Sequence, residues 1–137
     1  MKPLQIAVIG IAMLLVSHSG AMAAEKKEFT ARVNADGIQK VEITGGSYFF
    51  DPNYIIVKVN VPVELTFKKE PGLIPHDVVL KAPDAGIDFE MELKETPQTV
   101  RFTPTKIGGY QFTCDKKLLF FESHQEKGMV GTLEVRE

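Results

Sequence analysis

The sequence predicts an all-β protein, built as a sandwich or barrel of about eight short strands. From Gln39 onward, short runs rich in Val, Ile, Phe, Tyr and Thr are bounded by Gly, Pro, Asn and Asp. The turn signals recur at intervals of roughly ten residues, which is the spacing of sandwich and barrel folds. No long helical period interrupts this pattern, and residues 115–127 are the one candidate for a short helix.

The strands follow one another with the alternation expected when each buries one face. Val63, Leu65 and Phe67 fall on one face of their segment, and Gly131, Leu133 and Val135 alternate with more polar residues in the last one. The paired glycines at 45–46 and 108–109 are interpreted as turns. The predicted strand segments are 40–45, 48–50, 54–59, 62–69, 76–81, 88–93, 98–104, 108–114 and 129–135.

The N-terminus has the form of a secretory signal. Lys2 supplies the positive region, residues 6–16 form an apolar run, and residues 21–23 give an A-x-A cleavage site. Because the apolar run is shorter than the about 20 residues of a transmembrane helix, we expect a periplasmic or otherwise exported protein. An uncleaved N-terminal anchor is the alternative. The expected organisation is a signal peptide over 1–23, a loose N-terminal lead-in over 24–38 and one domain over 39–137.

Composition and charge narrow the function classes. The 137 residues carry a formal net charge of −2 at pH 7, and loss of the leader removes one further positive charge with Lys2. No basic patch therefore points to nucleic acid. A single cysteine leaves no internal disulfide, and a domain of this size can bury a core without one. We expect a soluble monomer with no stable membrane insertion once the leader is cleaved.

Few side chains beyond the leader can bind a soft or borderline metal: Cys114, His76, His124, Met91 and Met129. Both histidines lie where a predicted strand meets a loop, and the cysteine ends a strand. Strand ends meet at the poles of a sandwich, so these residues can converge. Two imidazoles, a thiolate and a long axial thioether form the ligand set of a blue-copper electron-transfer site. Met91 is interpreted as a strand residue and is not assigned to the metal.

Two stretches, PHDVVL and YQFTC…HQEKGMVGTLEV, resemble the cupredoxins, and the plastocyanin-like blue copper proteins most closely. The resemblance covers residues 39–137 and implies the Greek-key β-sandwich or barrel of that family. Carried over residue by residue, it implies one type 1-like copper per chain, held by His76, Cys114 and His124 with Met129 as the axial ligand. It also implies a one-electron carrier between redox protein partners, without catalytic turnover of its own, with His124 near the surface as the electron exit.

The loop between Cys114 and His124 is unusually long for that family, where only a few residues separate the two ligands. A longer loop adds little closure entropy. It can nevertheless distort the site, or allow Glu122 or Glu126 to compete for the metal.

The same loop contains four consecutive apolar residues, which suggest a partner surface. If they are exposed, they form a hydrophobic docking patch with a charged rim. The alternative is a short helix with Asp115 as N-cap, packed over the open end of the sandwich. The apolar residues are Leu118, Leu119, Phe120 and Phe121, and the rim consists of Lys116, Lys117, Glu122 and Glu126.

A second departure from the family is Asp77, where an asparagine commonly follows the first histidine. A backbone N–H donated to the thiolate survives this change. An ionised carboxylate near copper is expected to lower its reduction potential.

Other site chemistries lack their signatures. The hypothesis of a cysteine protease has no supporting motif. The closely spaced ligand pairs of structural zinc sites are also missing. A dinuclear copper centre requires a second cysteine, which the chain does not have. Two alternatives to the electron carrier stay open: a copper-binding module for delivery, storage or tolerance, and an auxiliary domain of an oxidase or other complex.

Overall fold

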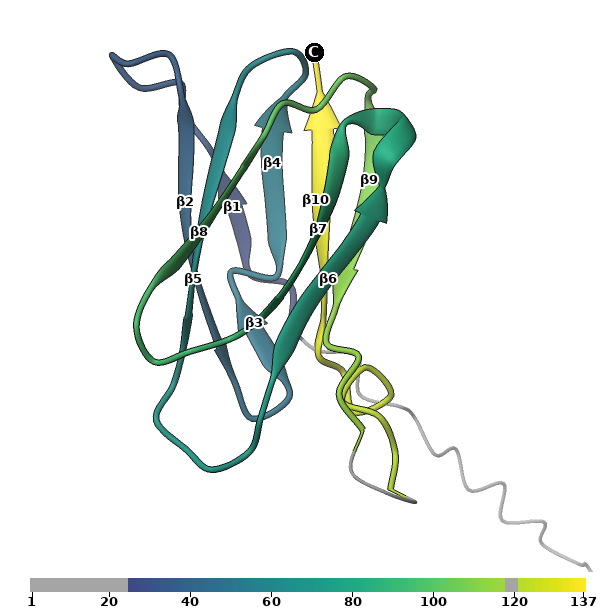
Figure 1. Cartoon of the computed structure of the whole chain (residues 1–137). Coiled ribbons are helices and arrows are strands. Elements are labelled where there is room, and N and C mark those ends of the chain that lie inside the picture. The colour runs from purple at the N-terminus through teal and green to yellow at the C-terminus, as the bar shows by residue number, and fades with distance from the viewer. Residues whose placement is uncertain (1–24, 118–120) are drawn as a thin grey trace, which may run out of the picture.

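The computed structural model describes residues 25–117 and 121–137 as two packed β-sheets (Figure 1). The leader and Leu118, Leu119 and Phe120 lie outside these residues. No helix in the described ranges is long and apolar enough to cross a membrane. The six-stranded sheet has the order β1 (Glu28–Thr30), β4 (Tyr54–Lys58), β10 (Val130–Arg136), β9 (Gly108–Thr113), β6 (Asp77–Ala82) and β7 (Ile87–Glu92). The four-stranded sheet has the order β3 (Phe49–Asp51), β2 (Gln39–Gly46), β5 (Val63–Lys69) and β8 (Gln98–Phe102), and the short helix η1 (Pro83–Ala85) joins β6 to β7.

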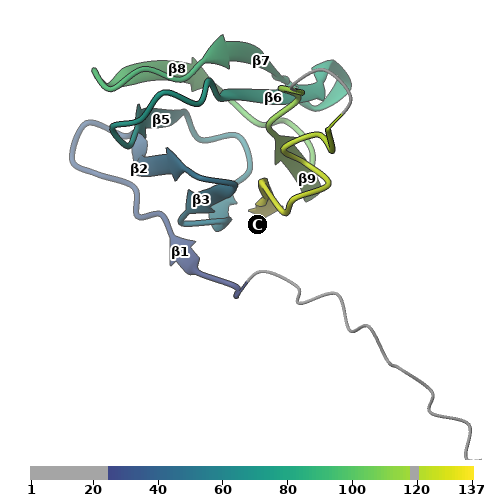
Figure 2. The ribbon, with the colours of Figure 1, turned by 90° about the horizontal axis from the view of Figure 1, so that it is seen from below.

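Figure 2 shows the two sheets from below, and the buried core residues lie between them. In β5, Val63, Leu65 and Phe67 are buried, and in β10 Leu133 and Val135 are buried, so the predicted inward faces are confirmed. The pairing is mixed, because β2 runs parallel to β5 while β9 runs antiparallel to β10. The all-β sandwich expected from the alternation is therefore present, with ten strands in the described part of the chain.

The first strand is a correction to the expected loose lead-in. Residues 28–30 form β1, which pairs in parallel with β4 and places Phe29 opposite Ile55. The Ala31 N–H then donates to the Ile56 carbonyl at 2.9 Å. All three β1 residues are exposed, so the strand is held by backbone hydrogen bonds and gives no alternating hydrophobic signal.

Both glycine pairs, interpreted above as turns, belong to strands; for the second pair this agrees with the predicted strand over 108–114. Gly45 and Gly46 end β2, and the pair at 108–109 begins β9. Close packing explains the first pair, since a Cβ on Gly45 would lie 2.6 Å from Leu93 and one on Gly46 would overlap the Phe49 ring. Glycine here permits close approach between segments rather than a turn.

The short helix that was the alternative to an exposed patch after Cys114 is not present in the described part of that segment. Residues 115–117 have no regular structure, and residues 124–128 form turns. Asp115 does not cap a helix; its carboxylate accepts a hydrogen bond from the Thr113 hydroxyl at 2.8 Å.

Candidate metal centre

The candidate ligands come together at one pole of the sandwich, at the lower end in Figure 1. His76 directly precedes β6, and Cys114 directly follows β9. His124 lies in the turn before β10, and Met129 is the last residue before that strand. Two neighbouring strands, β6 and β9, therefore supply two ligands, and the connection from β9 to β10 supplies the others.

Three ligand atoms form a compact triangle. The Nδ1 atoms of His76 and His124 are 3.1 Å apart, and the Cys114 Sγ lies 4.0 Å and 3.4 Å from them, respectively. The circumradius of a triangle with these sides is about 2.1 Å, so one point in its plane is about 2.1 Å from all three atoms. Metal bonds to imidazole nitrogen and thiolate sulfur are about 2.0–2.3 Å long. The three side chains could therefore hold one metal ion in a trigonal plane without rearrangement.

Burial sets the protonation of these ligands. His76, Cys114 and His124 are 3%, 0% and 4% exposed. Desolvation, with help from the neighbouring His124 and Lys69 charges, lowers the pKa of His76 to about 4, and desolvation also lowers the pKa of His124. Burial raises the pKa of the Cys114 thiol to about 11. Near neutral pH both imidazoles are uncharged and ready to bind, while the thiol must lose a proton to a metal.

Asp77 ties the two ligand strands together. Its backbone N–H donates to Cys114 Sγ at 3.4 Å, which confirms that this contact survives in the absence of asparagine. Its carboxylate Oδ1 accepts the Asp115 N–H at 2.7 Å. Because Asp77 forms hydrogen bonds to both Cys114 and Asp115, the thiol has a fixed position relative to β6.

Met129 is completely buried beside this cluster. Its N–H donates to the His124 carbonyl at 3.0 Å, and its own carbonyl accepts the Cys114 N–H at 3.2 Å. A Cβ on Gly45 would lie 3.5 Å from the Met129 methyl, so the end of the thioether side chain rests against the end of β2. The backbone bonds fix Met129 between two ligands, and its axial role stays a prediction.

The acidic residues of the long loop lie outside the cluster. Glu122 and Glu126 are both exposed, and the Glu126 carboxylate accepts the Ser123 N–H and hydroxyl at 2.7 and 2.9 Å. Among the described His, Cys, Asp and Glu residues, the group that could hold a metal contains only the two histidines and Cys114.

The sequence analysis missed Tyr48, which covers both imidazoles. It follows β2 with a φ of 66°, an uncommon backbone conformation for a residue other than glycine. Its ring meets the rings of His76 and His124 edge-on, with centroids 6.2 and 5.1 Å apart. Lys127 Nζ lies 4.5 Å from the Tyr48 ring centroid and donates to its hydroxyl at 3.3 Å. No hydrophobic period marks a turn residue of this kind.

This cover corrects the expectation that His124 lies at the surface. At 4% exposure it is buried, because Tyr48 and the surrounding loops enclose it. It nevertheless lines a cavity of about 260 Å³ that opens beside exposed Leu73, Ile74 and Phe121. Lys116, Lys117, Glu122 and Lys127 also line this cavity.

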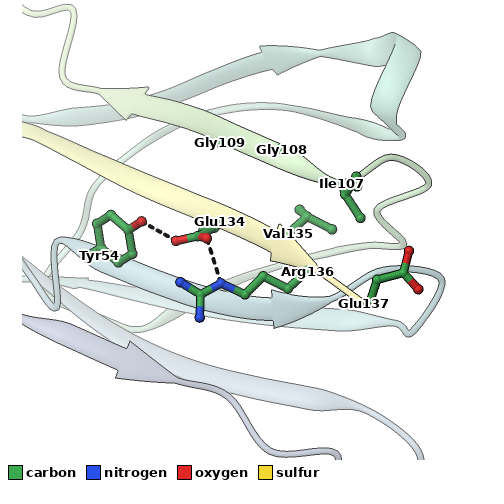
Figure 3. Close-up of a pocket in the computed structure, with 8 residues that line it drawn as sticks. All are labelled: Tyr54, Ile107, Gly108, Gly109, Glu134, Val135, Arg136 and Glu137. Atoms are coloured by element: carbon green, nitrogen blue, oxygen red, sulfur yellow. Dashed lines mark hydrogen bonds and ion pairs between the residues drawn. The ribbon is translucent and has the colours of Figure 1, made fainter.

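A second hollow, between β4 and the ends of β9 and β10, contains no candidate ligand (Figure 3). The Tyr54 hydroxyl donates to the Glu134 carboxylate, which also pairs with Arg136 Nε at 2.6 Å. These contacts link β4 to β10 at the surface, and we interpret them as structural.

Comparisons with known proteins show the fold. No family model and no curated protein matches the chain. The metal-binding domain of the Cu(I)-exporting P-type ATPase CopA of Streptococcus pneumoniae D39 is 21% identical, with 82% of this chain and 99% of that one covered and a TM-score of 0.61. Auracyanin from Roseiflexus castenholzii is 20% identical, covering 72% and 97% with a TM-score of 0.56. The periplasmic domain of cytochrome oxidase subunit II from Bradyrhizobium japonicum is 14% identical, covering 72% and 83% with a TM-score of 0.52.

Proposed function

We propose that this chain, which has the cupredoxin fold, binds one copper ion through His76, Cys114 and His124, with Met129 as the axial ligand. The observation that carries the proposal is the triangle of two Nδ1 atoms and one Sγ, whose centre lies within bonding distance of all three. Neutral imidazoles and a thiolate form the trigonal set of type 1 copper sites. When bound, copper supplies a one-electron couple.

The surroundings of the site support electron transfer rather than catalysis. A carrier needs ligands that keep their positions in both oxidation states. Asp77 holds the thiol through its N–H and carboxylate, and the backbone of Met129 bonds to both Cys114 and His124. The three ligand side chains are at most 4% exposed, which leaves little room for a substrate at the metal.

We place the docking surface for a redox partner at the mouth of the cavity above His124. Leu73, Ile74 and Phe121 are exposed there, with fractions of 103%, 42% and 63%. Lysines border these apolar side chains, as in interfaces with an apolar centre and a polar rim. The neighbouring Leu118, Leu119 and Phe120 complete the predicted patch and lie outside the described residues.

The proposal includes export, cleavage of residues 1–23 and a monomeric domain. The structure of cytochrome oxidase subunit II that resembles this chain is a periplasmic domain, which is consistent with this location. Residues 1–23 lie outside the described residues.

Copper delivery is the second candidate function. Its support is the likeness to the metal-binding domain of a Cu(I)-exporting P-type ATPase. The two functions differ in how firmly the metal is held. A carrier retains copper through many redox cycles, whereas a delivery module releases Cu(I) readily to an acceptor.

The deciding experiment is a titration of the reduced metal-free protein with Cu(II), followed by visible absorption, with Cys114→Ser as the control. An intense thiolate-to-copper band that saturates at one copper per chain, and is lost in the control, would support the site. A titration without such a band would exclude Cys114 as a ligand of Cu(II). Two further measurements then separate the candidate functions. Ready release of Cu(I) to a chelator would favour delivery, whereas retained copper with fast electron self-exchange would favour electron carriage.

A further inference from the structure

Lys69 is a positive charge in the inward register of a core strand. Along β5, Val63, Leu65, Phe67 and Lys69 alternate as buried residues, and Lys69 is 9% exposed. It is the last residue of β5, so the end of the inward row nearest the metal centre carries an ammonium group where an apolar side chain would be expected. Burying an ammonium group is unfavourable unless it is paired and hydrogen-bonded.

The Lys69 ammonium has one identified partner, which is a neutral one. Its Nζ donates to the Gly72 carbonyl at 2.6 Å. None of the ion pairs among residues 25–117 and 121–137 includes it. A carbonyl satisfies one donor but does not neutralise the charge, which therefore acts on its surroundings.

Those surroundings include the metal centre. Lys69 and His76 line the same small cavity, of about 150 Å³. Lys69 is also opposite Gly45 in the sheet, and Gly45 packs against the Met129 methyl. In agreement with this placement, the positive charge of Lys69 contributes to the lowered pKa of His76, after burial and His124. The negative groups on this side are Glu70, which lines the cavity but is exposed, and Asp77, which is bonded to Asp115.

We infer that Lys69 determines which copper oxidation state the centre prefers, by favouring Cu(I) over Cu(II). This inference rests on the proposed function. Reduction adds one electron to the metal and lowers the charge of the site by one unit. A fixed positive charge nearby repels the more positive Cu(II) state more strongly, so it raises the reduction potential.

Four variants separate this charge effect from a purely structural one. Lys69→Met removes the charge and the hydrogen bond to Gly72. Lys69→Gln removes the charge and keeps a donor, while Lys69→Arg keeps the charge. Lys68→Met is the matched control, because Lys68 is the preceding residue of β5 and its side chain is exposed.

The measurement is the ratio of Cu(I) to Cu(II) affinity, obtained by competition with chelators specific for each ion, together with the reduction potential. We expect the ratio to fall about tenfold in Lys69→Met and Lys69→Gln, which corresponds to about 59 mV for a one-electron couple. Lys69→Arg and Lys68→Met should stay within about twofold of the native protein, because the buried charge is retained in both.

Three outcomes overturn the inference, and they can be told apart. If Lys69→Gln keeps the native ratio while Lys69→Met does not, the hydrogen bond to Gly72 matters and the charge does not. If both keep the native ratio, Lys69 has no influence on the metal. If the native protein forms no thiolate-to-copper band, the proposed function fails, and this inference fails with it.

Discussion

The affinity of the site for Cu(I) should rise about tenfold with each unit of pH across the neutral range. In the proposed site Cys114 binds copper as a thiolate, but its pKa of about 11 keeps it protonated in the metal-free protein. Ionising this thiol at pH 7 costs about 5 kcal/mol, because each pH unit below the pKa corresponds to about 1.36 kcal/mol. The metal must supply this energy, and one proton leaves for each copper bound.

The histidines set the lower limit of this pH window. The pKa values of both histidines are lowered from the ordinary 6.5, that of His76 to about 4. Above pH 6.5 both imidazoles are therefore neutral and release no proton when copper binds. The logarithm of affinity should therefore rise with a slope of one between about pH 6.5 and 11. Below that window the slope should steepen as the imidazoles become protonated and must be deprotonated by the metal.

The assay is anaerobic competition for Cu(I) against a chelator, at pH 6.5, 7.5 and 8.5, corrected for proton binding by the chelator itself. Cys114→Ser is the control and should lose both affinity and most of the slope. A slope near zero in the native protein would refute the reasoning, because it would mean that the thiol is already ionised or does not bind the metal. A slope near two would mean that a second group loses a proton.

The remaining predictions concern stability and geometry. The metal-free protein should lose up to about 3 kcal/mol of unfolding free energy as the pH falls from 6.5 to 4. The reason is that His76 has a pKa of about 4 in the folded chain, so in this range the unfolded chain binds a proton at His76 that the folded chain does not. Urea unfolding at several pH values tests this, and unchanged stability would contradict it. Asp77→Ala should shift the copper absorption band, because the bond to the Asp115 N–H is lost, whereas Asp77→Asn should keep the band position; equal spectra for the two variants would disprove the role of the side chain. Gly131→Ala should destabilise the fold by about 1–3 kcal/mol, because its Cβ would overlap the Phe112 ring in the core. A native urea midpoint would argue against this packing.

The parts of the fold that follow a repeating pattern could be predicted from the sequence. The alternation in β5 and β10 gave the inward faces, and the order of His76, Cys114 and His124 gave a cluster that the structure brings together. Strand β1 could not be predicted in this way, because its pairing with β4 uses backbone groups and its side chains are all exposed. The sequence pattern predicts a strand only where apolar side chains on the buried face alternate with polar side chains on the exposed face.

The details around the metal centre depend on three-dimensional placement instead. Tyr48 covers the histidines because its backbone adopts a positive φ, and no neighbouring residue type predicts that conformation. Lys69 is at the end of a strand, where a lysine usually marks the surface. Only its register with Phe67 and the loop at Gly72 turns it inward. The burial of His124 has the same origin, since segments distant in the sequence enclose it.

The complete burial of Cys114 has a consequence for the protein before it meets a metal. Thiol–disulfide exchange requires a thiolate that an incoming disulfide can reach. With no exposed surface and a pKa of about 11, the thiol is ionised in only about one molecule in ten thousand at pH 7, and no bulky oxidant can approach it. A metal ion is far smaller than such an oxidant, and His124 and His76 each line a cavity beside the site. The folded chain can therefore wait in an oxidising compartment with an unpaired cysteine, protected from dimerisation and from mixed disulfides, until copper arrives.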